Sequence, residues 1–463
     1  MRIALVVPET GLNFNDACAP LNLAYIASYL RKTVSSVDIK IIDGMAKQNV
    51  TGLISRFQPD IIGVTAVTPQ APSAYKLLDS IRRDMPNVFT VIGGIHASQL
   101  PYEAINHADC VVIGEGEKAF SNIVKAIINK QQVAKIIQGE PIECLDDIPS
   151  PAYDLLDMKI YLKNGSKFPK INYPNMAMVT SRGCPYRCRF CWNSNRHSTV
   201  RYFSAQRIAD EILFFKKEYG INSVFFNDDE FLINSKRLQE LFVLFKHYEI
   251  DKWLTWGCQA RARTITLPIL KLIKEMNCVL VSIGLESGCN RILNYLKNGS
   301  GSVEDNTKAL STANKVGIAM GGSFIFGTPT ETFVEMKETM EWCWNNDNLM
   351  FFGINILTPY PGTQVWKDCE IFGLIPKNLD YERLIPPQYP NEKMLVVSTL
   401  PKKKFVKYVI DFHRMAWLYS HVRCNPSPKT FFKLAIAPSW WYLWIKFPKP
   451  VFKLMLYSFR HEA

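Results

Sequence analysis

The sequence predicts an α/β protein with an N-terminal doubly wound parallel sheet, an open partial barrel and a mainly helical C-terminal tail. Strand-like and helix-like segments alternate along residues 1–130 and again along 176–360, which is typical of parallel sheets. The strand-like segments are apolar runs, and this indicates strands that are covered on both faces. Residues 361–463 lose the alternation, which sets them apart as a tail.

The first 130 residues carry the first set of strand–helix units. Helical periodicity occurs at 21–32 and 71–86, between strand-like segments at 3–8, 37–44, 60–68, 89–95 and 109–116. Short parallel strands joined by helices predict a Rossmann-like sheet. Ligands bind such sheets at the carboxyl ends of the strands, and here those ends are residues 64–69, 93–98 and 114–117.

A proline-bearing linker at 131–175 leads into a second set of six strand–helix units, at 176–365. Six units are too few to close an eight-stranded barrel, so we expect a partial (β/α)6, TIM-like barrel. Its active site is expected at the C-terminal ends of its strands. Residues 366–463 then form a basic, aromatic and mainly helical C-terminal region.

Charge and cysteine content narrow the cellular setting. The net charge is +12, but residues 401–463 hold 12 Lys or Arg against Asp411 and Glu462, so the main body is near neutral. The chain shows no secretory signal and no apolar stretch of about 18 residues, so neither secretion nor a membrane span is predicted. We therefore expect a cytoplasmic protein whose 12 cysteines stay reduced.

Three cysteines follow the first predicted barrel strand: Cys184, Cys188 and Cys191. Three thiolates on one loop suit an iron–sulfur cluster of four irons with one iron left open. A zinc site is the alternative, although structural zinc takes four ligands and the nearest further candidate is His197. Three inert buried cysteines are the remaining possibility.

The Cys-x3-Cys-x2-Cys spacing, with an aromatic residue before the third Cys, resembles the signature of the radical S-adenosylmethionine (SAM) superfamily. Further segments resemble the family's strand endings and occur in the expected order, at 226–231, 284–288, 327–332 and 358–363. The resemblance implies a [4Fe-4S] cluster with SAM on its open iron, reductive cleavage of SAM, and a reducing partner such as flavodoxin or ferredoxin. No other cysteines repeat the spacing, so a single cluster is expected.

The same resemblance implies which residues contact SAM. Phe190 and Trp192 would flank the adenine, Gly284 and Glu286 would lie near the amino acid or ribose, and Arg261 would lie near the carboxylate. Other catalytic residues are not predicted.

Each of these assignments has an alternative. Glu286 or Ser287 would suit an N-cap of the following helix, and Arg261 would suit a surface ion pair. Asp228 and Asp229 would either cap the second barrel strand or meet the substrate.

The N-terminal domain resembles the cobalamin-binding domain that is often fused ahead of this barrel. The resemblance lies at 20–25, 43–44, 63–65, 93–98 and 114–117, and it implies a corrinoid site that includes Thr65, Gly93, Gly94, His96, Gly114 and Glu115. The Asp-x-His-x-x-Gly motif that supplies a lower cobalt ligand is absent. The glycines would let a corrin approach the backbone, but they equally suit tight turns. A packed or capping role competes with axial ligation for His96.

The tail interleaves Trp440, Trp441, Tyr442 and Trp444 with lysines 433, 446, 449 and 453. This mixture suits peripheral membrane contact through 401–463 or a lipid substrate. A helical cap that packs its aromatic residues on the barrel is the alternative. Nucleic acid is not expected, because the barrel has no basic excess.

The motifs together predict cobalamin-dependent methylation of an unactivated carbon in a small-molecule, lipid or natural-product substrate. The alternative within enzymes is a cobalamin-free radical SAM enzyme that performs carbon–carbon bond formation, cyclisation or rearrangement. A non-catalytic iron–sulfur or zinc module that binds a partner is the alternative from another class. The substrate itself has no motif in the sequence.

Overall fold

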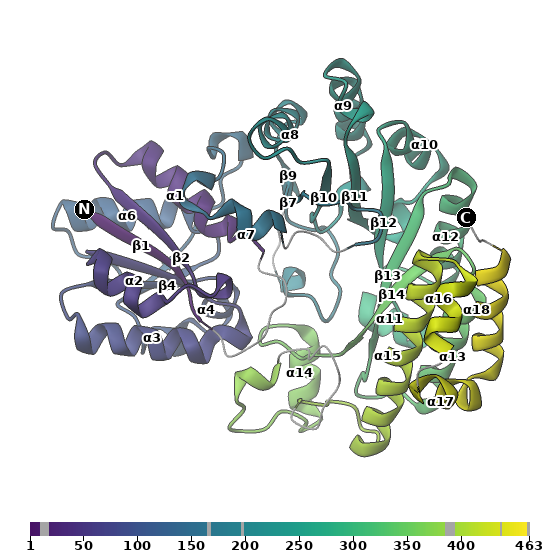
Figure 1. Cartoon of the computed structure of the whole chain (residues 1–463). Coiled ribbons are helices and arrows are strands. Elements are labelled where there is room, and N and C mark those ends of the chain that lie inside the picture. Colours follow the sequence, from purple (N-terminus) through teal and green to yellow (C-terminus); the bar gives the residue numbers. More distant parts are fainter. Residues whose placement is uncertain (10–17, 164–167, 196–198, 385–393, 436–437, 461–463) are drawn as a thin grey trace.

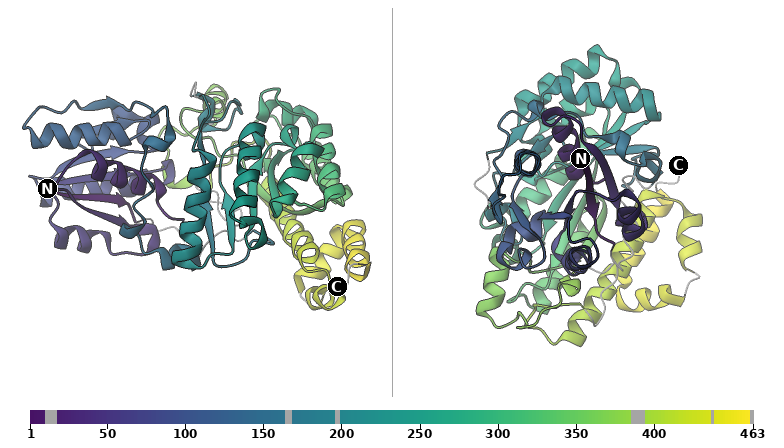
Figure 2. Two further views of the ribbon diagram at one scale, coloured as in Figure 1. Left: turned by 90° about the horizontal axis from the view of Figure 1, so that it is seen from above. Right: turned by 90° about the vertical axis from the view of Figure 1, so that its left-hand side faces the viewer.

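The computed structural model describes residues 1–9, 18–163, 168–195, 199–384, 394–435 and 438–460. The N-terminal sheet and the barrel lie side by side, and the last helices pack on the far side of the barrel (Figures 1 and 2). The predicted fold class, with its two parallel sheets and helical tail, is confirmed.

The N-terminal sheet has six parallel strands in the order β2-β1-β3-β4-β5-β6. Residues of β1 alternate between two cores: Ile3 and Leu5 face α1 and α6, whereas Ala4 and Val6 face α2 and α3. The sheet is therefore covered on both faces, as its apolar strands predict. The strands are β1 Arg2–Val7, β2 Asp38–Asp43, β3 Ile61–Thr65, β4 Phe89–Gly93, β5 Cys110–Ile113 and β6 Ile136–Gln138. The helices are α1 Leu21–Thr33, α2 Val50–Phe57, α3 Ala71–Asp84, α4 Ile95–Gln99, α5 Pro101–Ala104 and α6 Glu117–Ile128.

One strand of this sheet comes from the segment expected to be a linker. β6 pairs with β5 through Val111–Ile113 against Ile136–Gln138. It spans only three residues, too few to show a periodic pattern. Described residues in the rest of the segment also pack on the two sheets, since Ile148 and Tyr153 are buried in the core and α7 (Met158–Lys163) contacts β7.

The second sheet is an open barrel of six parallel strands in the order β14-β13-β12-β11-β10-β7. The strands are β7 Asn175–Met178, β10 Ser223–Phe226, β11 Thr255–Ala260, β12 Cys278–Glu286, β13 Ala319–Phe326 and β14 Leu349–Ile356. The helices between them are α8 Ala205–Tyr219, α9 Ser235–His247, α10 Leu267–Glu275, α11 Asn290–Lys297, α12 Val303–Val316 and α13 Phe333–Asn345. A two-residue antiparallel ribbon, β8 (Ser181–Arg182) with β9 (Arg201–Tyr202), flanks the cysteine segment.

The C-terminal region continues through α14 (Gln364–Ile371) to the long helix α15 (Lys402–Cys424), which packs on β14. Tyr419 fixes this contact, because its buried hydroxyl donates to the Leu349 carbonyl at 2.8 Å. Three shorter helices follow: α16 Pro428–Ala435, α17 Pro438–Lys446 and α18 Pro448–Arg460. Among the described residues, no helix is long and apolar enough to cross a membrane.

Candidate active site

The three motif cysteines lie together at the C-terminal end of the barrel. Cys184, Cys188 and Cys191 all line one cavity of about 1350 Å³, here called the cysteine cavity. The Cys191 amide donates to the Cys188 carbonyl at 3.0 Å and so tightens the loop. Among the described residues, no three His, Cys, Asp or Glu side chains are close enough to hold a single ion, and His197 lies outside those residues. Zinc would need all its thiolates about 2.3 Å from one centre, whereas a multi-iron cluster is ligated at separate irons.

The environment of two of these thiols disfavours their ionised form. Burial raises the pKa of Cys191 to about 11 and also raises that of Cys184, and the charge of Asp229 adds to both shifts. The thiolate is the form that binds iron, and a bound cationic cluster would favour it over the thiol. Arg261 supplies further positive charge, because its Nη1 lies 3.1 Å from Cys188 Sγ. The donor set therefore fits an iron–sulfur cluster.

Four of the five residues expected to contact SAM line the cysteine cavity: Phe190, Arg261, Gly284 and Glu286. Trp192 does not line it and faces the neighbouring cavity described below.

Arg261 is buried, with its guanidinium 3.8 Å from the centre of the Tyr186 ring. The same guanidinium donates to Ser300 Oγ at 2.7 Å. This position is inside the barrel, so the surface ion pair considered for Arg261 does not match it.

Glu286 is held at a positive φ of 60°, which is uncommon for a residue other than glycine and is often found at functional sites. Its carboxylate lies 3.5 Å from Lys297 Nζ, and Lys297 also donates to the Gly284 carbonyl. Neither Glu286 nor Ser287 is the N-cap of α11, which is Cys289 and has no side-chain capping bond. The Ser287 Oγ instead accepts the Cys289 amide at 3.1 Å, one residue ahead of the helix.

Lys297 was not predicted from the sequence, although a signal for it exists. It follows Leu293 by one helical turn on the apolar face of α11, and both residues are buried. A lysine on a buried helical face needs a charged partner, which here is Glu286.

The two aspartates after β10 have different positions. Asp228 is buried and accepts hydrogen bonds from the Thr180 amide at 2.5 Å and from Ser181 Oγ at 2.7 Å, so it ties the end of β10 to the end of β7. Asp229 faces open space and accepts a bond from Asn193 Nδ2 at 2.6 Å. Burial and the neighbouring Asp228 raise the pKa of Asp229.

A second cavity, of about 600 Å³, lies between the N-terminal sheet and the barrel. It is called the glycine cavity here, because Gly63, Gly93, Gly94 and Gly114 line its N-terminal wall together with Thr65 and Glu115. Its other wall comes from the barrel and includes Gly183 and Trp192. Five of the six residues expected at a corrinoid site are thus brought together at the carboxyl edge of the sheet.

At two glycines of the N-terminal wall, Gly63 and Gly94, a side chain does not fit. Gly94 has φ of 95°, and a Cβ at this position would lie 2.8 Å from both the Ala66 carbonyl oxygen and Thr65 Oγ1. A Cβ on Gly63 would lie 2.9 Å from the Phe120 ring. The result is exposed backbone at strand ends, a surface that a flat corrin ring can approach closely.

His96 is the one predicted corrinoid residue that does not line this cavity. Its ring is fully buried, with Nε2 2.9 Å from the Tyr75 hydroxyl and 3.5 Å from Glu103 Oε1, and it packs edge-on against Tyr381. These contacts match the packed role that competes with axial ligation for His96.

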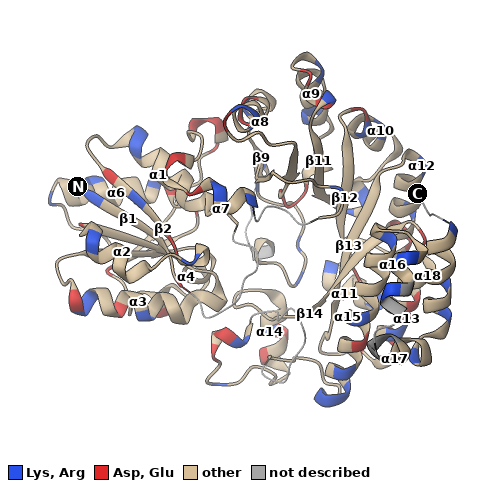
Figure 3. Cartoon of the chain, viewed as in Figure 1, with Lys and Arg blue, Asp and Glu red and all other residues tan. Residues whose placement is uncertain are grey.

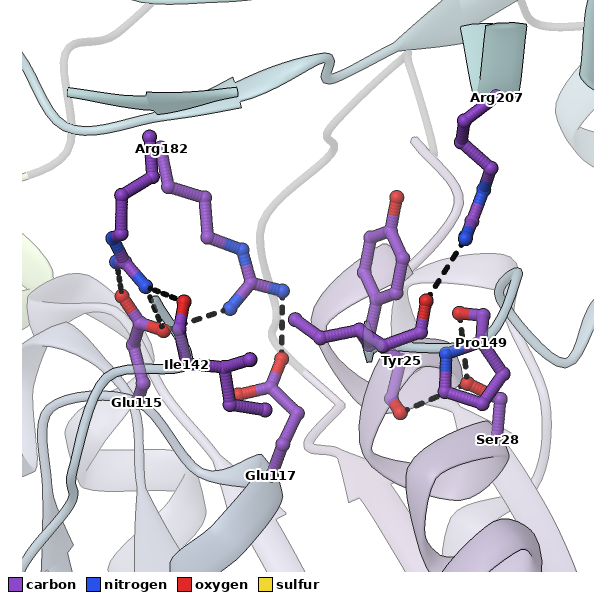
Figure 4. Close-up of polar contacts among 10 residues, drawn as sticks. Tyr25, Ser28, Glu115, Glu117, Ile142, Pro149, Arg182 and Arg207 are labelled. Carbon is purple, nitrogen blue, oxygen red and sulfur yellow. Dashed lines mark hydrogen bonds and ion pairs between the residues drawn. The ribbon is translucent and has the colours of Figure 1, made fainter. Parts of the chain in front are cut away.

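Ion pairs across the domain interface close one side of the glycine cavity. Arg182 of β8 donates to Glu115 at 3.0 Å and to Glu117 at 2.7 Å (Figure 4). Arg201 of β9 also binds Glu115. Although burial acts to raise it, Arg201 and Arg182 hold the pKa of Glu115 below its usual range. Glu115 therefore lines the cavity, but its charge is neutralised by two arginines of the barrel domain.

The two cavities adjoin at one polar pair. Asn193 and Asp229 line both of them. Asn193 comes from the turn that follows Cys191, and Asp229 from the end of β10. Side chains from α15 form the far wall of the cysteine cavity, where Trp417 stacks on His421 with ring centres 5.0 Å apart.

Comparisons with known proteins agree with this arrangement. Residues 178–343 match the model of the radical SAM superfamily, and residues 10–124 match that of the B12 binding domain. The chain is 34% identical over 393 residues to an uncharacterized methyltransferase of Pyrococcus horikoshii, covering 79% of this chain and 83% of that one. It is 29% identical over 328 residues to the bacteriochlorophyllide d C-8(2)-methyltransferase of Chlorobaculum tepidum, covering 68% and 69%.

Among solved structures, the cobalamin-dependent SAM radical enzyme OxsB, with aqua-cobalamin and SAM bound, superposes with a TM-score of 0.70 at 18% identity. The match covers 98% of this chain and 72% of OxsB, and it shows a shared fold.

The barrel, its cysteine loop and the sheet ahead of it thus define a radical SAM enzyme with a cobalamin-binding type of domain. The chain belongs to the radical SAM superfamily, in the group that joins this barrel to a B12 binding domain. The predicted family is confirmed, and so are the cofactors that it implies, a [4Fe-4S] cluster and SAM.

Proposed function

We propose that this chain is a cobalamin-dependent radical SAM methyltransferase that acts on an unactivated carbon. The observation that carries the proposal is the adjoining of the cysteine cavity and the glycine cavity at Asn193 and Asp229. Such a methylation removes hydrogen with one cofactor and supplies the methyl group from another, so it needs two cofactor sites side by side. The methyltransferase names of both relatives support this function.

The chain's own residues have distinct tasks in this proposal. When bound, the cluster with SAM supplies the 5′-deoxyadenosyl radical, and the corrinoid supplies the methyl group. Cys184, Cys188 and Cys191 would hold the cluster, with Arg261 stabilising the charge of Cys188. The Glu286–Lys297 pair would orient SAM, because its buried charges fix each other in place.

We propose a large, mostly apolar natural product or lipid as the substrate. The cysteine cavity exceeds the roughly 300–1,000 Å³ of ordinary ligand pockets, so it has room for a substrate beside SAM. Its walls away from the cysteines include Phe351, Phe352 and Trp417. The Chlorobaculum relative is named for acting on bacteriochlorophyllide d, which supports a bulky ring-bearing substrate.

The test is anaerobic reconstitution of the full chain and of Cys188→Ala, followed by iron, sulfide and cobalt analysis and an absorption spectrum. Dithionite replaces the small electron carrier, of flavodoxin or ferredoxin type, that we expect in the cell. Wild type should bind iron and corrinoid and form 5′-deoxyadenosine from SAM. Cys188→Ala should lose the 5′-deoxyadenosine and keep the corrinoid, since Cys188 does not line the glycine cavity.

Two other outcomes would contradict the proposal. A wild type that forms 5′-deoxyadenosine but binds no corrinoid would favour a cobalamin-free radical SAM enzyme. A wild type that binds iron but never cleaves SAM would favour a binding module.

We also propose that the C-terminal helices contact a membrane surface. Trp441 and Ile445 of α17 are 66% and 83% exposed, and Phe452 and Phe459 of α18 are half exposed. Basic residues are spread over the same helices (Figure 3). Apolar side chains beside lysines are typical of helices that lie in a membrane interface.

Point substitutions suit this test better than removal of residues 401–463, because α15 is part of the barrel core. Full-length protein should float with vesicles of anionic lipid, and a Trp441→Ser, Ile445→Ser double variant should float less. Val243, which is 61% exposed on α9, offers a matched control through Val243→Ser. Equal flotation of all three proteins, or of none, would refute membrane contact.

A further inference from the structure

The carboxylates that line the two cavities differ in how they are neutralised. Four carboxylates line them within the described part of the chain: Glu115, Glu117, Asp229 and Glu286. Arg182 pairs with the first two, at 3.0 and 2.7 Å, and Lys297 lies 3.5 Å from Glu286. Asp229 instead accepts a bond from the neutral amide of Asn193. It is therefore the lining carboxylate whose charge these neighbours leave uncompensated.

The position of Asp229 is as distinctive as its charge. It lines both cavities and lies where they meet, as does its partner Asn193. The Asn193 bond engages Oδ2 of Asp229. An ionised carboxylate only accepts, so the amide must donate, and this bond fixes the orientation of the Asp229 side chain.

The chemistry of SAM brings a positive charge to the same place. A methyl group that passes from SAM to the glycine cavity has to cross the junction between the cavities. The sulfonium sulfur is one bond away from that methyl group. The positive charge therefore arrives at the junction together with the methyl group that it activates.

We propose that Asp229 recognises the sulfonium of SAM, with Asn193 holding its carboxylate in place. The inference rests on the proposed function for the direction of methyl transfer, and it adds the residue that selects the methyl donor. Opposite charges at close range attract each other, and they attract more strongly once the bound cofactor displaces water from between them. S-adenosylhomocysteine has lost the charge with the methyl group, so the same residue would favour exchange of spent cofactor for fresh SAM.

The test compares SAM with S-adenosylhomocysteine on protein reconstituted with iron and sulfide but without corrinoid. Both molecules share the amino acid and the adenosine, and they differ in the methyl group and its charge. Dissociation constants for the two radiolabelled compounds are measured by equilibrium dialysis for wild type, Asp229→Asn and Asp229→Glu. The matched control is Asp210→Asn, an exposed aspartate on α8 whose partner is also an amide, that of Gln206.

Asp229→Asn should lower the preference for SAM over S-adenosylhomocysteine by roughly tenfold, the change that about 1.4 kcal/mol produces. Its affinity for S-adenosylhomocysteine and its iron content should stay as in wild type. Asp229→Glu, which keeps the charge, and Asp210→Asn should both retain the wild-type preference.

An unchanged preference in Asp229→Asn would overturn the inference and point to substrate contact. Equal weakening of both compounds, or loss of iron, would also overturn it, because Asp229 would then support the loop rather than sense charge. The measurement needs neither substrate nor corrinoid. A failure of the proposed methyltransferase function would show instead as missing corrinoid or missing methylated product, and would be distinguishable.

Discussion

The cysteine cavity and the glycine cavity share a border but are built from different parts of the chain. The first takes its chemistry from side chains at strand ends, among them Cys188, Arg261 and Glu286. The second includes bare backbone at Gly63 and Gly94 in its wall and is closed by ion pairs between domains. A site made of side chains is lost when atoms are removed, whereas a site made of backbone is lost when atoms are added. The two cavities should therefore fail under opposite kinds of substitution.

The largest expected effect on stability comes from removing the ion pairs between the barrel and the glycine cavity. Arg182→Met removes the partner of Glu117, which is buried, and one of the two partners of Glu115. Leaving a buried charge unpaired costs about 3 kcal/mol, so unfolding in denaturant should shift by that order and corrinoid binding should fall. Arg83→Met removes an exposed ion pair with Asp84 and should change little. Equal stabilities of the two variants would show that the ion pairs of Arg182 do not hold the domains together.

The second effect is a pH dependence of stability, which should have opposite sign for carboxyl groups in the two cavity regions. Burial raises the pKa of Glu230, beside Arg261, to about 7. The folded protein keeps this proton up to about pH 7, whereas the unfolded chain releases it near its ordinary value of about 4.3. Between these values the folded state binds more protons at Glu230, so the contribution of this residue to stability falls as pH rises and levels off above pH 7.

Glu230→Gln should abolish this fall, which amounts to about 2 kcal/mol between pH 5 and 7. Unfolding midpoints of the variant and wild type across pH 5–8 measure the difference. Glu115 should behave in the opposite sense, because its lowered pKa makes its contribution disappear only as the pH drops into the acid range. Parallel pH profiles for wild type and Glu230→Gln would contradict the assigned shift.

The contrast also explains what could be predicted from the sequence. The cysteine motif and the barrel's strand endings are local patterns, so the three thiols, Arg261 and Glu286 could be placed together in advance. The contact between Arg182 and Glu115 joins residues 67 positions apart and leaves no local trace. Two further features depend in the same way on how distant elements pack. Trp192 lines the glycine cavity, and Trp417 contributes to the far wall of the cysteine cavity. The strand β6 was not predicted, because three residues are too few to show the alternating pattern of a strand.

The smallest expected effect tests whether the glycine cavity depends on bare backbone. Gly94 has φ of 95° and ψ of −176°, a region that only glycine occupies readily. Gly94→Ala would push its Cβ against Ala66 and Thr65 and displace the wall of the cavity. Binding of hydroxocobalamin, followed by absorbance, should weaken about tenfold, or about 1.4 kcal/mol. Iron content and formation of 5′-deoxyadenosine should be unaffected, since Gly94 does not line the cysteine cavity.

Gly317→Ala is the matched control, because Gly317 also has a positive φ, of 71°, but a Cβ there meets nothing within 4 Å. It should cost about 1 kcal/mol of stability through backbone strain alone and leave the affinity for hydroxocobalamin unchanged. Equal corrinoid affinities in both variants would mean that the corrinoid does not rest on this wall. Loss of iron in Gly94→Ala would mean that the two cavities are coupled through the domain interface, and that they cannot be treated as separately built sites.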